Sequence, residues 1–217
     1  MGNVSDAAKV RQMRAPHGPD HAMEEARDID GLRAVANGDR KAFERLYLRY
    51  HARLSRFLAR HALQRHQVDE VINETMWVVW RTAGDFRGES KVGTWIIGIA
   101  YRCFLKMLRD TPAALSPAGA AGAVDADDSP GPDETEARET RDWVRRGLAL
   151  LPVEQRLTME LVYYLGQSYE EVARIMECAV GTVKARMFHA RVRLRSSLPG
   201  LGGELARLPL DPPGEPR

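Results

Sequence analysis

Cysteine is scarce in this sequence, with 2 among 217 residues, Cys103 and Cys178. Both lie far apart in helical patterns, so we expect buried, reduced thiols, with a disulfide or a shared metal as the weaker alternative. No apolar run approaches the length of a membrane-spanning helix, and the N-terminus lacks the apolar core of a signal peptide. These absences predict a cytoplasmic protein that does not insert into a membrane.

Catalytic signatures are missing as well. The sequence contains no Gly-rich phosphate loop, no Cys-x-x-Cys pair and no Gly-x-Ser-x-Gly elbow. His51, His61 and His66 lie in or near one expected helix, but no cysteine or acid accompanies them at metal-ligand spacing. We therefore expect no enzyme, no catalytic residue, no metal, no cofactor and no small-molecule substrate.

The charge is unevenly distributed, although the net charge is only +2. Six acids crowd one segment that also contains four prolines and shows no apolar periodicity, which is typical of a flexible linker. These acids are Asp125, Asp127, Asp128, Asp133, Glu134 and Glu136. The pattern predicts an all-α fold of two small helical domains, residues 29–110 and 139–198, joined by an acidic linker over 111–138. Residues 1–28 are expected to form a disordered arm and residues 199–217 a flexible tail.

The second domain has the pattern of a helix-turn-helix. Pro152 suits the first turn of a helix whose apolar stripe ends at Gly166. Ser168 and Glu171 form a Ser-x-x-Glu capping box for a short second helix. After a break at residues 177–179, a third helix carries many cations and no acid before Leu198. This combination predicts a reader of the DNA major groove, and the alternative is a three-helix bundle whose arginines are merely solvated.

The first domain is expected to hold four helices. Asp30 is a plausible start for the first, and Asp39 can cap a longer second helix with a sustained apolar ladder. A third helix over residues 68–82 carries one face of acids and aromatics, which can be a solvated surface or a docking surface for a partner helix. A fourth helix, beginning near Val92, carries a basic line that can be solvated or can follow a single DNA strand. That line is Arg102, Lys106 and Arg109.

Three blocks of the second domain resemble the fourth conserved region of bacterial sigma factors of the extracytoplasmic-function group. They are residues 151–156 (LPVEQR), 168–173 (SYEEVA) and 180–186 (VGTVKAR). Residues 68–80 (VDEVINETMWVVW) are similar to the family's second region, whose helix grips core RNA polymerase. The resemblance implies polymerase contacts at Asp69, Glu70, Asn73, Glu74, Trp80 and Arg81.

The same resemblance implies two DNA surfaces. Residues 86–90 (FRGES) and 94–95 (TW) resemble the segment that opens and reads the −10 element, with contacts at Phe86, Arg87, Ser90, Lys91, Trp95, Arg102 and Lys106. The third helix of the second domain would read the −35 element through Thr182, Lys184, Ala185, Arg186, His189 and Arg191. The chain departs from the family at Asn73, Val78, Cys103, His189 and Glu177. We expect the turn at Glu177, where relatives carry glycine, to be rebuilt rather than strained.

These features lead us to expect a promoter-specificity subunit with three partners: core RNA polymerase, promoter DNA and an anti-sigma factor. The alternative is a stand-alone helix-turn-helix regulator that binds duplex DNA as a dimer. Against the alternative, the first domain lacks the alternating strand–helix pattern and the acid cluster of a receiver domain.

Overall fold

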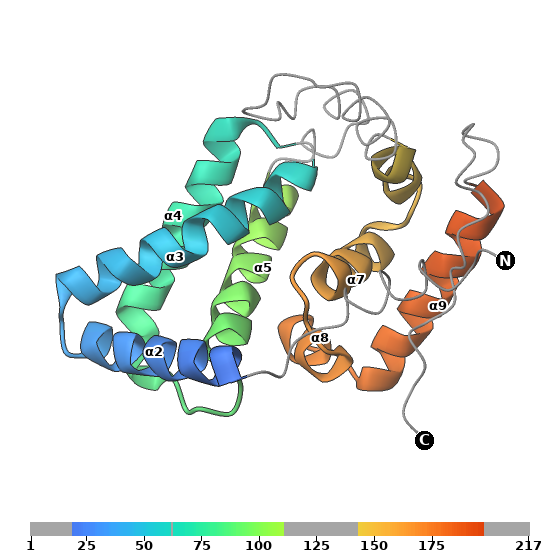
Figure 1. Ribbon diagram of the computed structural model, residues 1–217. Helices are drawn as coiled ribbons and strands as arrows, with labels where there is room; N and C mark the ends of the chain where they lie inside the picture. Colours follow the sequence, from blue (N-terminus) through green and yellow to red (C-terminus); the bar gives the residue numbers. More distant parts are fainter. Residues whose placement is uncertain (1–18, 62, 111–142, 198–217) are drawn as a thin grey trace, which may run out of the picture.

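The computed structural model describes residues 19–61, 63–110 and 143–197, and all elements within them are helical. Two groups of helices lie side by side (Figure 1). The first group comprises α2 (Pro19–Ala36), α3 (Arg40–Leu58), α4 (Arg65–Thr82) and α5 (Val92–Asp110), with the short 3-10 turns η1 (Ala59–His61) and η2 (Ala83–Asp85). The second comprises a helical segment over 143–149, then α7 (Val153–Tyr163), α8 (Tyr169–Ile175) and α9 (Val180–Ser197). The expected all-α fold is confirmed for this part of the chain.

Local capping explains where two of these helices begin. The Asp39 carboxylate accepts from the backbone N–H groups of Lys41 and Ala42, at 2.8 and 3.1 Å, and so caps α3 as expected. Ser168 and Glu171 form the expected capping box of α8, since each side chain accepts from the backbone N–H of the other. These bonds satisfy amide groups that lack partners at a helix start.

Several expected boundaries were wrong. The first helix begins at Pro19, not near Asp30, so residues 19–28 belong to a helix rather than to a disordered arm. Long-range contacts hold this extension, because Asp28 is buried and accepts from the Tyr50 hydroxyl at 2.5 Å. The helix expected over 68–82 begins at Arg65. The helix expected to stop at Gly166 ends at Tyr163.

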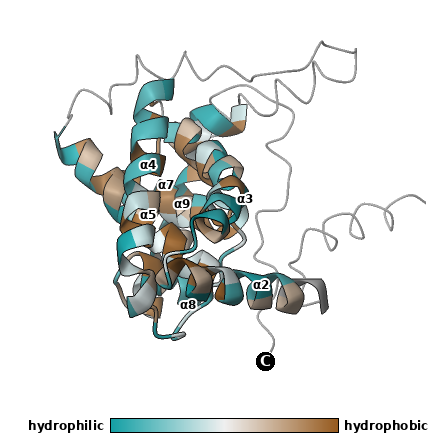
Figure 2. Cartoon of the chain, turned by 90° about the vertical axis from the view of Figure 1, so that its left-hand side faces the viewer, coloured by the Kyte–Doolittle hydropathy of each residue, from teal (hydrophilic) through white to brown (hydrophobic). Residues whose placement is uncertain are grey.

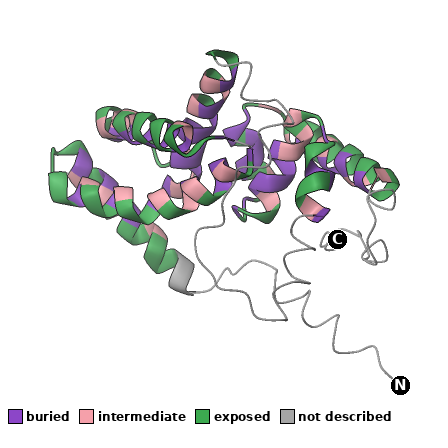
Figure 3. Ribbon diagram, turned by 90° about the horizontal axis from the view of Figure 1, so that it is seen from above, coloured by how far each residue is buried: buried purple, intermediate pink, exposed green. Residues whose placement is uncertain are grey.

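The core continues from the first group of helices into the second. Figure 2 shows hydrophobic residues on the facing sides of the helices, and Figure 3 shows buried residues gathered along the centre of the molecule. Helix α5 lies at this junction and packs against α8 as well as α4. The sequence predicted two small helical domains, and it gave no indication that they are in contact, as the two groups of helices are in this structure. The arm over 1–18, the linker acids and the tail over 198–217 lie outside the described residues.

Candidate nucleic-acid interface and docking surface

Helices α7, α8 and α9 build a helix-turn-helix around a small apolar core. Val183, Met187, Ala190 and Leu194 are buried and fix which side of α9 faces inward. The turn before α9 holds Glu177 in the left-handed region, with φ of 52°. The expectation that this turn is rebuilt was therefore wrong, and the non-glycine residue adopts the strained conformation. Its carboxylate lies 3.1 Å from Arg102 on α5.

The structure divides the six residues predicted to read the major groove. Four of them, Thr182, Lys184, Ala185 and His189, are exposed on α9. The Arg186 side chain is only 20% exposed, because it pairs with Glu154 of α7 and lies beside the sulfur of Cys178.

Arg191 is the other exception. Its guanidinium donates to the hydroxyls of Tyr163 and Tyr169, at 3.2 and 3.3 Å. Arg186 and Arg191 therefore hold α9 in place within the helix-turn-helix. They are not among the cations that project from it.

Sequence reasoning missed Phe188 on the exposed side of α9. Its side chain is 62% exposed, and Val192, one turn further along, is 51% exposed. Residues 181, 185, 188 and 192 recur at helical spacing and so share one face. An aromatic residue at this position can contact the methyl group of thymine in the major groove. The signal in the sequence was an apolar residue that falls outside the buried positions 183, 187, 190 and 194.

Helix α4 presents an acidic, partly aromatic face to solvent. Asp69, Glu70, Asn73, Glu74 and Arg81 are all exposed on it. The exposed indole of Trp77 lies on the same helix face as these acids. A surface of acids and an aromatic ring is suited to a basic partner helix.

Two tryptophans of α4 have different surroundings. Trp80, which was predicted to contact the polymerase, is half-buried and packs edge-on against Phe43 of α3, with ring centroids 5.2 Å apart. Trp77 is 55% exposed instead. Asn73 accepts from the Tyr47 hydroxyl at 3.2 Å. The structure therefore makes Trp77 the exposed aromatic of this face and Trp80 a packing residue.

The residues predicted to hold the −10 strand lie along α5 and the loop before it. Phe86 and Trp95 are half-buried neighbours, with ring centroids 5.4 Å apart. Arg87 and Lys106 are exposed, and Ser90 is half-buried.

Two other cations of this surface already have partners. Lys91 Nζ lies 2.9 Å from Glu171 Oε1, and Arg102 is bonded to Glu177. Helix α8 and the turn after it thus occupy part of the predicted strand surface.

The two cysteines are not bonded to each other in the part of the chain that the structure describes. Cys103 and Cys178 are half-buried, which is less buried than expected. Burial raises the pKa of the Cys103 thiol, although the Thr75 hydroxyl opposes it. Among the residues with described positions, no group of three His, Cys, Asp or Glu side chains could hold a metal ion. Within the same residues, every helix is too short or too polar to cross a membrane.

Known protein families match both groups of helices. The family described as sigma-70 region 2 matches residues 46–112, and sigma-70 region 4 matches residues 141–194. The ECF RNA polymerase sigma factor SigM of Mycobacterium tuberculosis is 35% identical over 170 residues, which cover 78% of this chain and 84% of the relative. The ECF RNA polymerase sigma-E factor of Escherichia coli is 32% identical, and the match covers 72% of this chain and 86% of the relative.

Two solved structures share the fold. CnrH in complex with the cytosolic domain of CnrY has a TM-score of 0.61 at 21% identity, covering 80% of this chain and 98% of that one. The sigma factor RpoE in complex with the anti-sigma factor NepR from Bartonella quintana has a TM-score of 0.56 at 24% identity. That match covers 73% of this chain and 98% of the other.

Proposed function

Because this chain belongs to the extracytoplasmic-function group of RNA polymerase sigma factors, we propose that it acts through three surfaces that its two groups of helices provide. It binds core RNA polymerase and directs transcription initiation at specific promoters. The acidic face of α4 docks on the polymerase. The loop before α5 and the basic line of α5 hold the melted −10 strand, and α9 lies in the major groove of the −35 element.

The observation that carries this proposal is the acidic face of α4 beside an exposed Trp77. A stand-alone regulator has no need of such a face, whereas a polymerase subunit does. The docking residues we assign are therefore Asp69, Glu70, Asn73, Glu74, Trp77 and Arg81. Trp80 acts indirectly, since it packs α4 against Phe43.

On α9 the exposed residues are assigned to the DNA bases and phosphates. Lys184 suits a guanine edge or a phosphate, and Phe188 suits a thymine methyl group. Arg186 and Arg191 position α9 and contribute to DNA binding through that support.

We expect catalysis to reside in the polymerase, with this chain supplying specificity and no catalytic activity of its own. Its place of action is then the cytoplasm, where the bacterial polymerase works. An anti-sigma partner is expected, since one solved structure that resembles this chain is of a sigma factor bound to an anti-sigma factor.

The test is reconstituted transcription from genomic fragments with purified core polymerase, in the presence and absence of the chain. We expect new start sites that share a −35 and a −10 sequence and that core polymerase alone does not use. The same start sites with and without the chain would contradict the proposal. A duplex-binding dimer that never joins the polymerase would instead favour the stand-alone regulator.

A further inference from the structure

Helix α3 carries a row of cations that lies outside the three surfaces assigned to polymerase and DNA. Residues 40–60, which comprise α3 and η1, contain seven arginines and lysines and a single acid, Glu44. Helical spacing places five of these cations on one side, and all five are exposed. This basic stripe consists of Lys41, Arg45, Arg49, Arg56 and Arg60.

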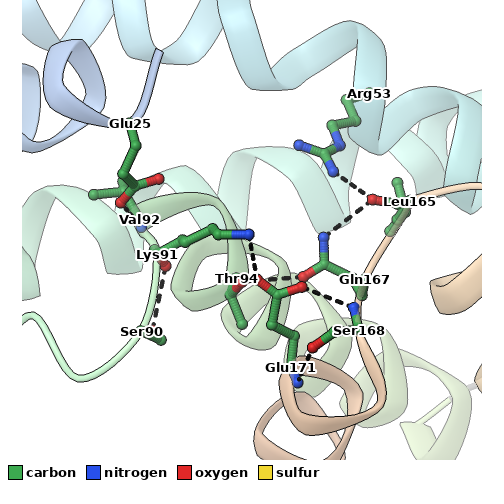
Figure 4. Close-up of polar contacts among 10 residues, drawn as sticks. All are labelled: Glu25, Arg53, Ser90, Lys91, Val92, Thr94, Leu165, Gln167, Ser168 and Glu171. Atoms are coloured by element: carbon green, nitrogen blue, oxygen red, sulfur yellow. Dashed lines mark hydrogen bonds and ion pairs between the residues drawn. The ribbon is translucent and has the colours of Figure 1, made fainter. Parts of the chain in front are cut away.

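The basic stripe is separate from the side of α3 that faces α4. Phe43 and Tyr47 mark that side, since they contact Trp80 and Asn73. Arg53 is not part of the stripe either, because it turns toward the second group of helices and donates to the backbone carbonyl of Leu165 at 2.6 Å (Figure 4). The acidic face of α4 and the basic stripe of α3 are therefore two distinct surfaces of opposite charge.

The stripe cations oppose the stability of α3. Lys41 lies in the first turn, where the partial positive charge of a helix N-terminus disfavours cations and where α3 has no acid. Like charges four positions apart repel, and the stripe contains three such pairs, 41–45, 45–49 and 56–60. In the part of the chain that the structure describes, only Arg49 of the stripe is paired with an acid, Asp28 of α2. Helix stability thus gives no reason for the stripe, whereas an anionic partner does.

The length and chemistry of the stripe fit the backbone of duplex DNA. From position 41 to position 60 a helix rises about 28 Å, which is about eight base pairs of duplex. Arginine, which supplies four of the five cations, matches phosphate through its planar fork of donors.

Two other anionic partners fit the stripe less well. A single strand calls for exposed rings on which bases stack, but the four aromatic residues of α3 are buried or half-buried. The nearby Tyr164 ring already has the Arg60 guanidinium over it, 3.5 Å from its centroid. A membrane surface calls for a broad apolar face beside the cations. Leu48 is the one large apolar side chain of α3 that is exposed, so α3 lacks such a face.

We propose that the basic stripe of α3 binds the phosphate backbone of duplex DNA without reading its sequence. The chain then has a third DNA contact, besides the −10 strand surface and α9. This inference rests on the proposed function only in taking promoter DNA as the polyanion that the chain meets. A contact of this kind adds affinity and salt dependence but no sequence preference.

The experiment compares duplex binding by the full-length wild type and two triple variants of equal charge. Arg49 and Arg60 are left unchanged, because they contact Asp28 and Tyr164. The stripe variant is Lys41→Gln/Arg45→Gln/Arg56→Gln. The control removes three cations that are exposed on other elements, as Arg27→Gln/Arg65→Gln/Arg146→Gln.

Fluorescence anisotropy measures the affinity for a short labelled duplex of random sequence as the salt concentration is varied. Each lost phosphate contact lowers the slope of log affinity against log salt by about 0.9, so we expect the stripe variant to lose about 2.7. The advantage of the wild type over the stripe variant then shrinks about fortyfold between about 50 and 200 mM salt. The control should keep nearly the slope of the wild type.

A charge-keeping variant, Lys41→Arg/Arg45→Lys/Arg56→Lys, should retain the slope of the wild type. Equal slopes for the stripe variant and the wild type would overturn the proposal. An equal loss in the stripe variant and the control would overturn it too, since net charge alone would then explain the effect. Because the stripe cations repel one another, the stripe variant should melt at the same temperature as the wild type or higher. A clearly lower melting temperature would show that these side chains stabilise α3, and it would count against the proposal.

Binding to core RNA polymerase separates this inference from the proposed function. We expect the stripe variant to bind the polymerase as the wild type does. A stripe variant that keeps its duplex affinity but loses the polymerase would make the stripe a protein-docking surface, and the proposal would be wrong. If the wild type itself does not bind the polymerase, the proposed function fails, whereas the salt slopes still decide whether α3 binds duplex DNA.

Discussion

Phe188 stands in the middle of the exposed side of α9, flanked by Lys184 and Val192 one turn away on either side. We predict that Phe188→Ala weakens binding of the reconstituted holoenzyme to its preferred −35 element by about 1–3 kcal/mol, the range for losing one base contact. The measurement is a competition assay over single-base variants of that element. The loss should be confined to one position, and Phe188→Leu should retain part of the contact. A uniform loss at every position would show that Phe188 supports the helix instead of reading a base.

Glu171 links stability to pH. Burial raises its pKa, but the Ser168 amide, the Lys91 ammonium and the Thr94 hydroxyl outweigh burial, so the pKa lies below its ordinary 4.5. Such a carboxylate stabilises the fold above its unfolded pKa and loses that effect as the pH falls through its folded pKa. We predict that acidification from about pH 7 to about pH 4 lowers the urea midpoint more in the wild type than in Glu171→Gln.

Glutamine is the right comparison because it preserves the capping box at this position while removing the charge. Equal sensitivity of both chains to acid would contradict a role for the Glu171 carboxylate.

A single capping residue, Asp39, stabilises the start of helix α3. Its N-terminus depends on the Asp39 carboxylate, which accepts two backbone N–H groups. We predict that Asp39→Ala lowers the free energy of unfolding by about 1 kcal/mol and that Asp39→Asn, which keeps an acceptor, costs much less. Thermal or urea unfolding checks the pair. Equal losses in both variants would mean that the charge matters more than the acceptor.

The elements that sequence reasoning predicted well are those specified locally. Asp39 and Ser168 cap helices through residues two or three positions away, and the buried positions of α9 repeat at regular spacing. The beginning of α2 was missed, because it depends on Asp28 meeting Tyr50 of another helix. The turn at Glu177 was misjudged: its residue adopts a positive φ of 52°, although it is not glycine, between α8 and α9, which pack against each other.

For the candidate surfaces, too, features set by local spacing were predicted, and features set by contacts between distant residues were not. Helical periodicity correctly placed the acidic face of α4 and the exposed positions 182, 184, 185 and 189 of α9, since exposure follows from spacing. It could not reveal that Arg186 and Arg191 have internal partners or that Trp80 packs on Phe43. The docking of α8 on α5 joins residues more than 70 positions apart, and no local pattern encodes it.

The interface between the two groups of helices also predicts how the size of the whole molecule changes when one interface side chain is removed. The Glu160 carboxylate and the His61 imidazole lie 2.7 Å apart with both side chains buried, and a buried polar group that loses its partner costs about 1–3 kcal/mol while it stays buried. In this chain the remaining partner can reach water if the groups separate. We therefore predict that Glu160→Ala extends the molecule in X-ray scattering while helix content by circular dichroism is maintained. Loss of helix content at an unchanged radius of gyration would contradict this expectation.

Binding of the purified chain to core RNA polymerase, measured for the wild type and for Glu70→Lys/Trp77→Ala, tests the role of α4 most directly. The control is Asp30→Lys/Met23→Ala on α2, because Met23 is 54% exposed, nearly the same as Trp77. We predict a one-to-one complex for the wild type and the control, and at least a roughly hundredfold loss for the α4 variant, as expected for interface residues worth about 3 kcal/mol together. Equal binding by all three chains, or no complex with the wild type, would contradict the assignment of α4 as the polymerase-docking surface.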